Sequence, residues 1–279
     1  MNPRVTTVVV TRDRWDDLSW SLPRQQRPVI LVDNGSTDGT PERVRAAFPD
    51  VTVIELGRNR GAVGRNAGVE AATTPYVAFA DDDSWWADAS LDRAADLFDR
   101  HVRLGLVAAR VLIGPEERLD PTCAAMAASP LGTPPGLPGP AVLGFVACGS
   151  VVRRQAFLEA GGFDPVVHFP GEEERLALDL ASANWSLAYV EEVVAHHHPS
   201  QTRAPSLRRR SLERRNEVLT AVMRRPWQVV GAVVREQLQE GEAGRRGVLG
   251  AVPRLPAALA RRRSLPPRVE EARRRLDAG

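Results

Sequence analysis

Short apolar runs alternate with stretches of helical character along the first hundred residues. The runs have the length of buried parallel strands and cover residues 5–10, 29–32, 51–56 and 76–80. Helical periodicity or helix-start residues lie between and after them, at 13–23, 40–48, 64–72 and 87–101. A β-α-β-α repeat with this spacing predicts an α/β fold with a largely parallel sheet and right-handed crossovers.

The pattern changes after residue 112. Residues 114–141 are rich in Pro, Gly, Ala and Ser and lack regular periodicity, which predicts a long loop that is either functional or disordered. An apolar strand pair is expected at 141–152 and a short helix at 155–160. A helix with an acidic first turn is expected at 171–185, and a closing strand at 191–198.

Polar side chains stand where the predicted strands end. Thr11, Asp33, Asn59 and the run 81–83 follow strands that would share one sheet edge. Because ligands bind at the carboxyl ends of the strands in open α/β sheets, we expect these residues to face one crevice. Each also has a structural interpretation of its own, for example Asp33 as a turn-forming residue.

Three consecutive carboxylates, Asp81 to Asp83, follow the fourth predicted strand. Two like charges about 4 Å apart repel by roughly 4 kcal/mol at an effective dielectric constant near 20. A cation would relieve this repulsion, and oxygen ligands favour Mg²⁺ or Mn²⁺ shared with a phosphate. The alternative is a solvated acidic loop in which Asp81 caps a helix.

Composition and charge add three limits. The chain is 43% hydrophobic and 26% charged, as in an ordinary globular protein, and it has neither a signal-peptide core nor an apolar stretch of membrane-spanning length. Its two cysteines form no disulfide framework, which predicts a reduced, cytoplasmic protein. All 37 basic residues are Arg, and residues 201–279 hold 19 of them against 8 acidic residues.

Several motifs together carry a resemblance to a known family. They are Val-Thr-Arg-Asp-Arg, Val-Asp-Asn-Gly-Ser-Thr-Asp-Gly-Thr, Gly-Arg-Asn-Ala-Gly, Phe-Ala-Asp-Asp-Asp and Gly-Gly-Phe-Asp. In this order and spacing, residues 4–200 resemble the family 2 glycosyltransferases of GT-A fold. The resemblance implies a mixed, mostly parallel sheet flanked by helices, with a Rossmann-like nucleotide-binding half. It also implies inverting transfer of a sugar from a nucleotide-diphosphate donor, assisted by a divalent metal, Mg²⁺ or Mn²⁺.

The resemblance assigns roles to individual residues. Asp33 would bind the nucleotide base, Arg65 would lie near the nucleotide, and Asp81 and Asp83 would contact the ribose and hold the metal. The further candidates for nucleotide-sugar binding are Thr11, Arg12, Asn59 and Asp82.

The general base and a histidine ligand should come from the second half. The family has Glu-Asp at the start of the acidic helix, with Asp as the base, whereas this chain has three Glu residues there. Alignment on Leu176 and Trp185 places Glu173 at the base position, with Glu172 as the second candidate. The family often has a His metal ligand near the closing strand, and His196 and His198 are the preferred candidates because they share a face there.

The resemblance implies a glycosyltransferase domain at 1–200, followed by an Arg-rich helical extension at 201–279. Within the domain, 1–112 would be the nucleotide-sugar-binding half and 113–200 the half that binds the acceptor and supplies the base. The extension either packs on the catalytic domain or a partner, or docks on an anionic membrane where the acceptor is lipid-linked. Nucleic acid is not an expected partner. Two other function classes stay open, a nucleotidyltransferase and a nucleotide-sugar-binding protein without activity, although the chain lacks the Gly-rich phosphate loop of the former.

Overall fold

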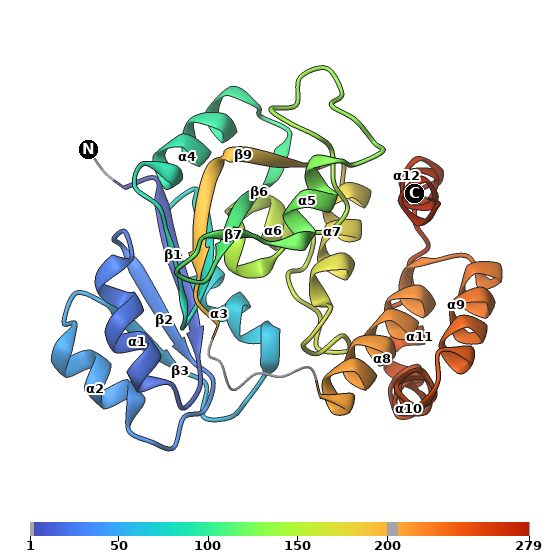
Figure 1. Cartoon of the computed structure of the whole chain (residues 1–279), viewed down its shortest axis with the longest axis horizontal. Helices are drawn as coiled ribbons and strands as arrows, with labels where there is room; N and C mark the ends of the chain where they lie inside the picture. The colour runs from blue at the N-terminus through green and yellow to red at the C-terminus, as the bar shows by residue number, and fades with distance from the viewer. Residues whose placement is uncertain (1–2, 200–205, 279) are drawn as a thin grey trace.

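The computed structural model describes residues 3–199 and 206–278. Within these residues a nine-stranded sheet has the order β3-β2-β1-β4-β8-β6-β9-β5, with β7 paired to β6 (Figure 1). The strands are β1 (Val5–Thr11), β2 (Val29–Asp33), β3 (Thr52–Glu55), β4 (Tyr76–Asp81), β5 (Ser84–Trp86), β6 (Leu104–Ile113), β7 (Arg118–Leu119), β8 (Ser150–Arg153) and β9 (Ser186–His197).

The sheet is mixed. Strands β3, β2, β1 and β4 run parallel, and so do β6 and β9. Strand β8 lies antiparallel between β4 and β6, and β5 lies antiparallel to β9 at the edge. The mostly parallel α/β fold expected from the repeat and the resemblance is therefore confirmed.

Helices cover both faces of the sheet, and side-chain alternation in β1 shows why. Val8 packs toward one face together with Val69 of α3, whereas Val9 packs toward the other with Leu18 of α1. Gly68 lets α3 approach the sheet closely, because a Cβ there would lie 2.4 Å from Cγ1 of Val8. The first face carries α3 (Gly64–Ala71), α5 (Pro121–Ala127), α6 (Arg154–Glu159) and α7 (Glu172–Ser182), and the second carries α1 (Trp15–Ser21), α2 (Thr40–Ala47) and α4 (Ser90–Arg100).

Two helix starts differ from the prediction. The first helix begins at Trp15 because Asp13 has a left-handed φ of 53° and its Oδ1 accepts the amide of Thr37 at 2.7 Å. The helix expected from residue 87 begins at Ser90, because residues 84–86 form the edge strand β5 against β9. Short 3₁₀ helices are η1 (Leu22–Arg24), η2 (Gly61–Val63), η3 (Ala147–Gly149) and η4 (Val252–Arg254).

The second half is more regular at 114–141, and less regular at 141–152, than predicted. The expected loop contains β7 and α5, and the carboxylate of Asp120 caps α5 by accepting the amide of Thr122 at 2.7 Å. Asp120-Pro121 is a helix-start signal that the sequence offered. The expected strand pair at 141–152 is instead an irregular segment followed by η3 and β8. The closing strand begins earlier than expected, at Ser186.

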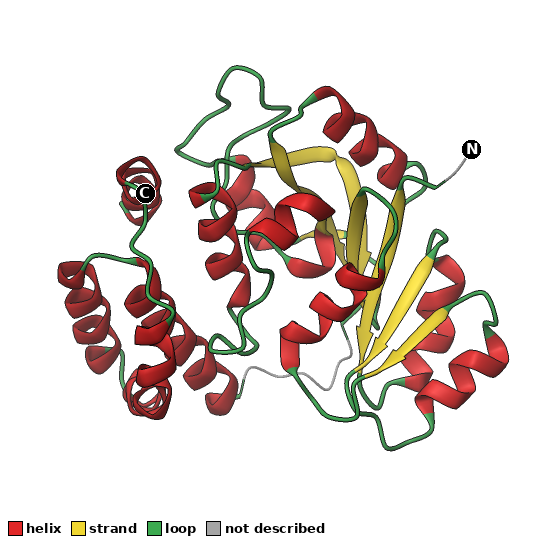
Figure 2. Cartoon of the chain, turned by 180° about the vertical axis from the view of Figure 1, so that it is seen from behind, coloured by secondary structure: helices red, strands yellow, loops and turns green. Residues whose placement is uncertain are grey.

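The C-terminal helices gather beside α7, away from the sheet (Figures 1 and 2). Leu178 of α7 packs with Leu265 and Val269, and Val166 and Val167 pack among the helices that follow. Residues 201–205, the first of the predicted extension, lie outside the described residues. Among the described residues, no helix combines the length and hydrophobicity needed to cross a membrane. The helices are α8 (Leu207–Arg224), α9 (Trp227–Gln239), α10 (Glu242–Ala251), α11 (Leu255–Ala260) and α12 (Pro267–Asp277).

Candidate active site

Register brings the predicted strand-end residues together. Thr11 of β1 pairs with Asp33 of β2, and Val10 pairs with Asp81 of β4. Three neighbouring parallel strands therefore end at the same level, and their polar residues lie at one edge. This is the crevice that the sequence predicted from separate segments.

The two carboxylate oxygens of Asp33 differ, because one stabilises a turn and the other is available to a ligand. Its Oδ2 accepts the amides of Gly35 and Ser36 at 3.1 and 3.0 Å, as a turn-forming Asp does. Its Oδ1 is buried and has no hydrogen-bond partner in the part of the chain that the structure describes. A buried acceptor without a partner is rare in folded proteins, and it suits an N–H donor from a ligand.

A cavity of about 340 Å³ lies along this edge. Thr11, Asn59 and Arg65 are among the residues that line it, and so are Arg12, Asp81 and Asp82. The side chain of Asn59 also accepts the amide of Gly61 at 2.8 Å, which orders the loop before α3. We call this space the donor cavity.

The three consecutive aspartates point in different directions. Asp81, which is partly exposed, and Asp82, which is 6% exposed, both line the donor cavity, whereas Asp83 is 2% exposed and is not among its lining residues. Asp82 accepts the hydroxyl of Thr11 at 3.2 Å, and Asp83 lies 3.3 Å from Nε2 of His197. The acidic run is therefore built into the fold, not a solvated loop.

The structure places His197 beside the aspartates, and not the preferred ligand candidates His196 and His198. In the pairing of β5 with β9, His196 stands opposite Trp85 and stacks on it, with ring centroids 5.1 Å apart. His198 contacts the rings of Trp20 and Trp85. Alternation correctly separates His197 from its neighbours, but only the pairing register shows which face meets the aspartates.

A small cluster of possible metal ligands results. Ligand atoms of Asp81, Cys148 and His197 all lie within 4.8 Å of one another. Carboxylate oxygen and imidazole suit Mn²⁺, and oxygen suits Mg²⁺. Burial raises the pKa of the Cys148 thiol, so it stays protonated and is a poor ligand for these hard ions. The residues present therefore fit a divalent cation through Asp81 and His197, with Asp83 beside them.

The charge of His197 fits the same picture. Burial alone would lower its pKa, but Asp83 and Cys148 outweigh this effect and raise the pKa of His197 to about 11. In the protein without a metal ion, the protonated imidazole thus partly balances the aspartates. Cys148 was not a predicted site residue, because its partners are distant in sequence.

The three Glu residues at the start of α7 have separate surroundings. Gly171, with a left-handed φ of 89°, precedes the helix. Glu172 is 1% exposed, and its Oε1 lies 3.6 Å from Nη1 of Arg65. Glu174 faces the C-terminal helices and accepts a hydrogen bond from Arg273 at 2.8 Å. Glu173 lines the cavities on either side of it.

Burial shifts both inner carboxyl groups of α7. Burial and the neighbouring charge of Glu173 raise the pKa of Glu172 to about 8, against the opposing effect of Arg65. Burial also raises the pKa of Glu173, which backbone amides and Arg65 partly oppose. A carboxyl group with a raised pKa is a better proton acceptor than an ordinary Glu.

Three cavities follow one another through these residues. Arg65 and Asp81 line both the donor cavity and a second cavity of about 380 Å³, which also contacts Cys148 and His197. Glu173 lines this second cavity and a third of about 420 Å³. Shared lining residues thus connect the donor cavity, the possible metal ligands and Glu173. We call the second space the metal-side cavity and the third the apolar cavity.

Comparison with known proteins agrees with this geometry. The model of the family described as Glycosyl transferase family 2 matches residues 15–160, more than half of the chain. An N-acetylglucosaminyl-diphospho-decaprenol L-rhamnosyltransferase of Mycobacterium tuberculosis is 28% identical over 214 residues, covering 63% of this chain and 69% of the relative. A pre-mycofactocin glycosyltransferase of the same species is 32% identical over 186 residues, covering 63% of this chain and 38% of the relative.

Solved structures share the fold. A mannosyltransferase of Pyrobaculum calidifontis in complex with GDP-Man and Mn²⁺ has a TM-score of 0.60 and 21% identity, covering 100% of this chain and 76% of its own. TarS of S. aureus in complex with UDP-GlcNAc has a TM-score of 0.56 and 16% identity, covering 79% of this chain and 67% of its own. The chain therefore belongs to glycosyl transferase family 2 and is a glycosyltransferase of GT-A fold.

Proposed function

We propose that the protein moves a sugar from a nucleotide-diphosphate sugar to a hydroxyl-bearing acceptor, with inversion at the anomeric carbon and with help from a divalent cation. The observation that carries this proposal is the path of neighbouring cavities, joined by shared lining residues, from the donor cavity past Asp81 and His197 to Glu173. An inverting reaction needs a leaving group on one side of the sugar and a base on the other. The path offers groups suited to each.

The donor would lie along the strand ends. Arg12, Asn59 and Arg65 offer polar contacts in the donor cavity. Asp33 is not among the residues that line this cavity, but it precedes the lining residue Asn34, and its Oδ1 offers a buried acceptor for an N–H of the base. The two structural relatives above were crystallised with nucleotide sugars, which supports this class of donor.

Asp81 and His197, with Asp83 beside them, would hold Mg²⁺ or Mn²⁺. Such a cation supplies neutralisation of the negative charge that develops on the leaving diphosphate. The Mn²⁺ in the mannosyltransferase complex supports a divalent ion in this fold. The thiol of Cys148 would stay protonated and contribute shape, not charge.

Glu173 would accept the proton of the attacking hydroxyl. Its place on α7 puts it between the metal-side cavity and the apolar cavity, and its raised pKa favours proton transfer from an alcohol. Glu172 would act through Arg65, which it contacts, and so position the guanidinium next to Asp81.

A substitution series tests this assignment. Glu173→Gln should lower kcat by roughly 10²- to 10⁴-fold, the usual size of a general-base effect, while nucleotide binding stays unchanged. Glu70→Gln, at an exposed position of α3, is the control and should keep the full rate. A larger loss in Glu172→Gln than in Glu173→Gln would reverse the assignment. Proton NMR of the product reads the anomeric configuration, and retention would refute the inverting mechanism.

Membrane contact is a separate part of the proposal. The rhamnosyltransferase relative is named for a decaprenol-linked acceptor, and residues 201–279 carry a surplus of Arg that could meet anionic lipid. Several of these arginines are already paired inside the protein, for example Arg225 with Glu270 at 2.8 Å. Flotation with phosphatidylglycerol vesicles, compared with phosphatidylcholine vesicles, tests the contact. Equal flotation with both would exclude it.

A further inference from the structure

The apolar cavity lies between the catalytic body and the C-terminal helices. One wall comes from α5 and residues 142–145, with Met126, Val142 and Phe145. The opposite wall comes from α8 and from Leu276 of α12. Its volume of about 420 Å³ is enough for a molecule of small-ligand size.

The cavity opens on Glu173. Thr122, Phe145 and Glu173 line both this cavity and the metal-side cavity, so the two spaces adjoin at these three residues. A molecule that fills the apolar cavity would therefore present its end to Glu173, on the side away from the donor cavity. That is where an acceptor hydroxyl has to be.

The charges around the cavity disfavour an anion inside it. Its lining includes Glu173, Glu174, Glu213 and Glu217, and Arg273 is the one cation among the lining residues that the structure describes. Arg273 is occupied, because it bonds both Glu174 and Asp277. A phosphate bound there would lie near carboxylates and would have no available Arg to pair with. Burying such an unpaired charge costs free energy, whereas an uncharged group avoids this cost.

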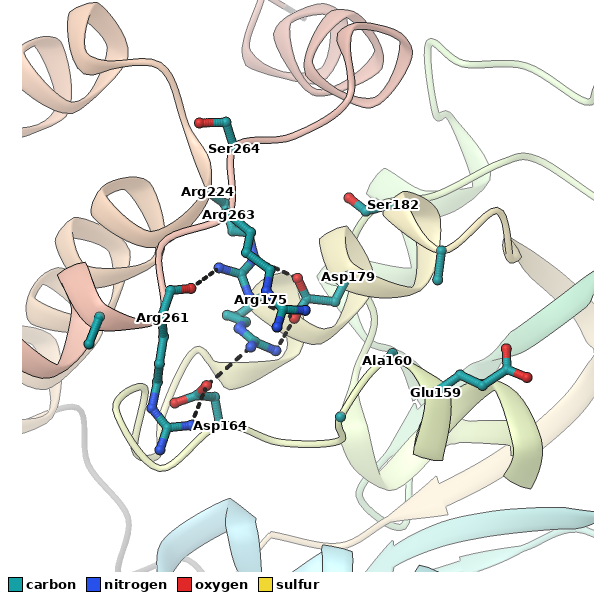
Figure 3. A pocket seen from close by; sticks show the side chains of 13 residues that line it. Glu159, Ala160, Asp164, Arg175, Asp179, Ser182, Arg224, Arg261, Arg263 and Ser264 are labelled. Atoms are coloured by element: carbon teal, nitrogen blue, oxygen red, sulfur yellow. Dashed lines mark hydrogen bonds and ion pairs between the residues drawn. The ribbon is translucent and has the colours of Figure 1, made fainter.

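The C-terminal wall is firmly joined to α7, the helix that carries Glu173. Arg224 of α8 bonds Asp179 of α7, with Nε 2.5 Å from Oδ1. Arg261 reaches Asp164 at 3.4 Å, and Arg175 links Asp164 to Asp179 (Figure 3). These charged groups come from both parts of the chain, and all of them except Arg261 are largely buried, so separating them would break buried ion pairs.

A second connection holds the segment that leads into α7. The side-chain Nδ2 of Asn216, a fully buried residue of α8, donates to the backbone carbonyl oxygen atoms of His168 and Pro170, the latter at 2.6 Å. These contacts therefore hold α8 against α7 and against the segment that leads into it.

We propose that the C-terminal helices complete the acceptor site and that the apolar cavity takes an uncharged, apolar portion of the acceptor, with the acceptor hydroxyl at Glu173. This assignment rests on the proposed transfer reaction. It makes Leu276 a specificity residue contributed by the C-terminal extension. It also places any phosphate of the acceptor outside this cavity.

Binding of simple probes tests the assignment in the full chain. Ligand-observed NMR titration should show n-hexyl β-D-glucoside binding at least tenfold tighter than methyl β-D-glucoside, and at least tenfold tighter than n-hexyl phosphate. Leu276→Arg on one wall and Ala125→Arg on the other should each remove the preference for the hexyl chain. Leu249→Arg, on an exposed part of α10, is the matched control and should change nothing.

The outcomes separate the two proposals. Equal affinity for the two glucosides, tighter binding of n-hexyl phosphate, or an unchanged preference in a folded Leu276→Arg or Ala125→Arg variant would overturn the assignment of the cavity. Stabilisation by nucleoside diphosphates, measured on the same samples, reports the donor site independently. If no nucleotide binds while the hexyl preference holds, the proposed reaction fails and the apolar cavity stands as a binding site.

Discussion

Nη2 of Arg65 donates a hydrogen bond to Oδ1 of Asp81 at 2.6 Å, which joins α3 to the end of β4. Nη1 of the same guanidinium lies 3.6 Å from Glu172 of α7. Arg65 is only 5% exposed, so one buried cation connects carboxylates from the donor side and from the base side of the site. Burial alone would lower the pKa of Arg65, but the surrounding carboxylates outweigh this and raise it, which keeps the guanidinium charged.

Removing this cation should destabilise the protein. In Arg65→Met, Asp81 and Glu172 lose their shared partner. Removing one partner of a buried ion pair typically lowers the free energy of unfolding by about 3–5 kcal/mol. Equilibrium unfolding in urea measures the change in free energy. Arg60→Met, at an exposed position of the preceding loop, is the control and should cost well under about 1 kcal/mol. A similar small effect of Arg65→Met would mean that the buried contacts do not support the site.

Glu172 should make stability depend on pH. Its pKa is about 8 in the folded protein against 4.5 for an ordinary Glu, so between these values the folded state binds more protons than the unfolded state. The contribution of Glu172 to the free energy of unfolding is therefore greatest below pH 4.5 and falls as the pH rises to 8. Glu172→Gln carries no such charge and should be more stable above pH 8, by up to about 5 kcal/mol at about 1.36 kcal/mol per pKa unit.

Urea unfolding at several pH values checks this difference. The gap between Glu172→Gln and the wild type should widen from pH 4.5 to pH 8 and then level off. Glu70→Gln, at an exposed position of α3, should show no such trend. A gap that is constant with pH, or of opposite sign at pH 8, would contradict the burial of an ionisable Glu172.

The histidines of β9 should differ in their effect on metal affinity. His197→Gln removes the imidazole beside Asp83 and should weaken the Mn²⁺-dependent part of nucleotide binding by about tenfold or more. His196→Gln, whose ring stacks on Trp85, is the neighbouring control and should leave that part unchanged. Calorimetric titration of a nucleoside diphosphate with and without Mn²⁺ separates the two. A larger loss of Mn²⁺-dependent binding in His196→Gln than in His197→Gln would instead support His196, a ligand candidate predicted from the sequence.

The sequence predicted the donor half of the fold well because its signals are local. Apolar runs of strand length and polar residues at their ends require no knowledge of distant partners, and the observed register brings Thr11, Asp33 and Asp81 to one edge. Alternation also separates His197 from its neighbours. Its orientation toward Asp83 depends on the pairing of β9 with β5, which joins residues more than a hundred positions apart.

The acceptor half was harder to predict because its residues come together through contacts between distant parts of the sequence. Cys148 reaches the metal-side cavity from a segment with no regular periodicity, and Leu276 reaches the apolar cavity from the last helix. Asp120-Pro121 did offer a local signal for α5, but the Pro- and Gly-rich surroundings obscured it. The contacts between α7 and α8 arise from tertiary packing, which the pattern of a single helix does not encode.

The most direct test of the central claim is a nucleotide screen by unfolding with UDP, dTDP and GDP, each with and without Mn²⁺, on the wild type, Asp81→Asn and the exposed control Asp88→Asn. We predict that one nucleotide at 100 times its dissociation constant adds about 2.7 kcal/mol with Mn²⁺ to the wild type and to Asp88→Asn. Asp81→Asn should lose the Mn²⁺-dependent part. Stabilisation that ignores Mn²⁺, or that is as large in Asp81→Asn, would contradict a cation held at the end of β4.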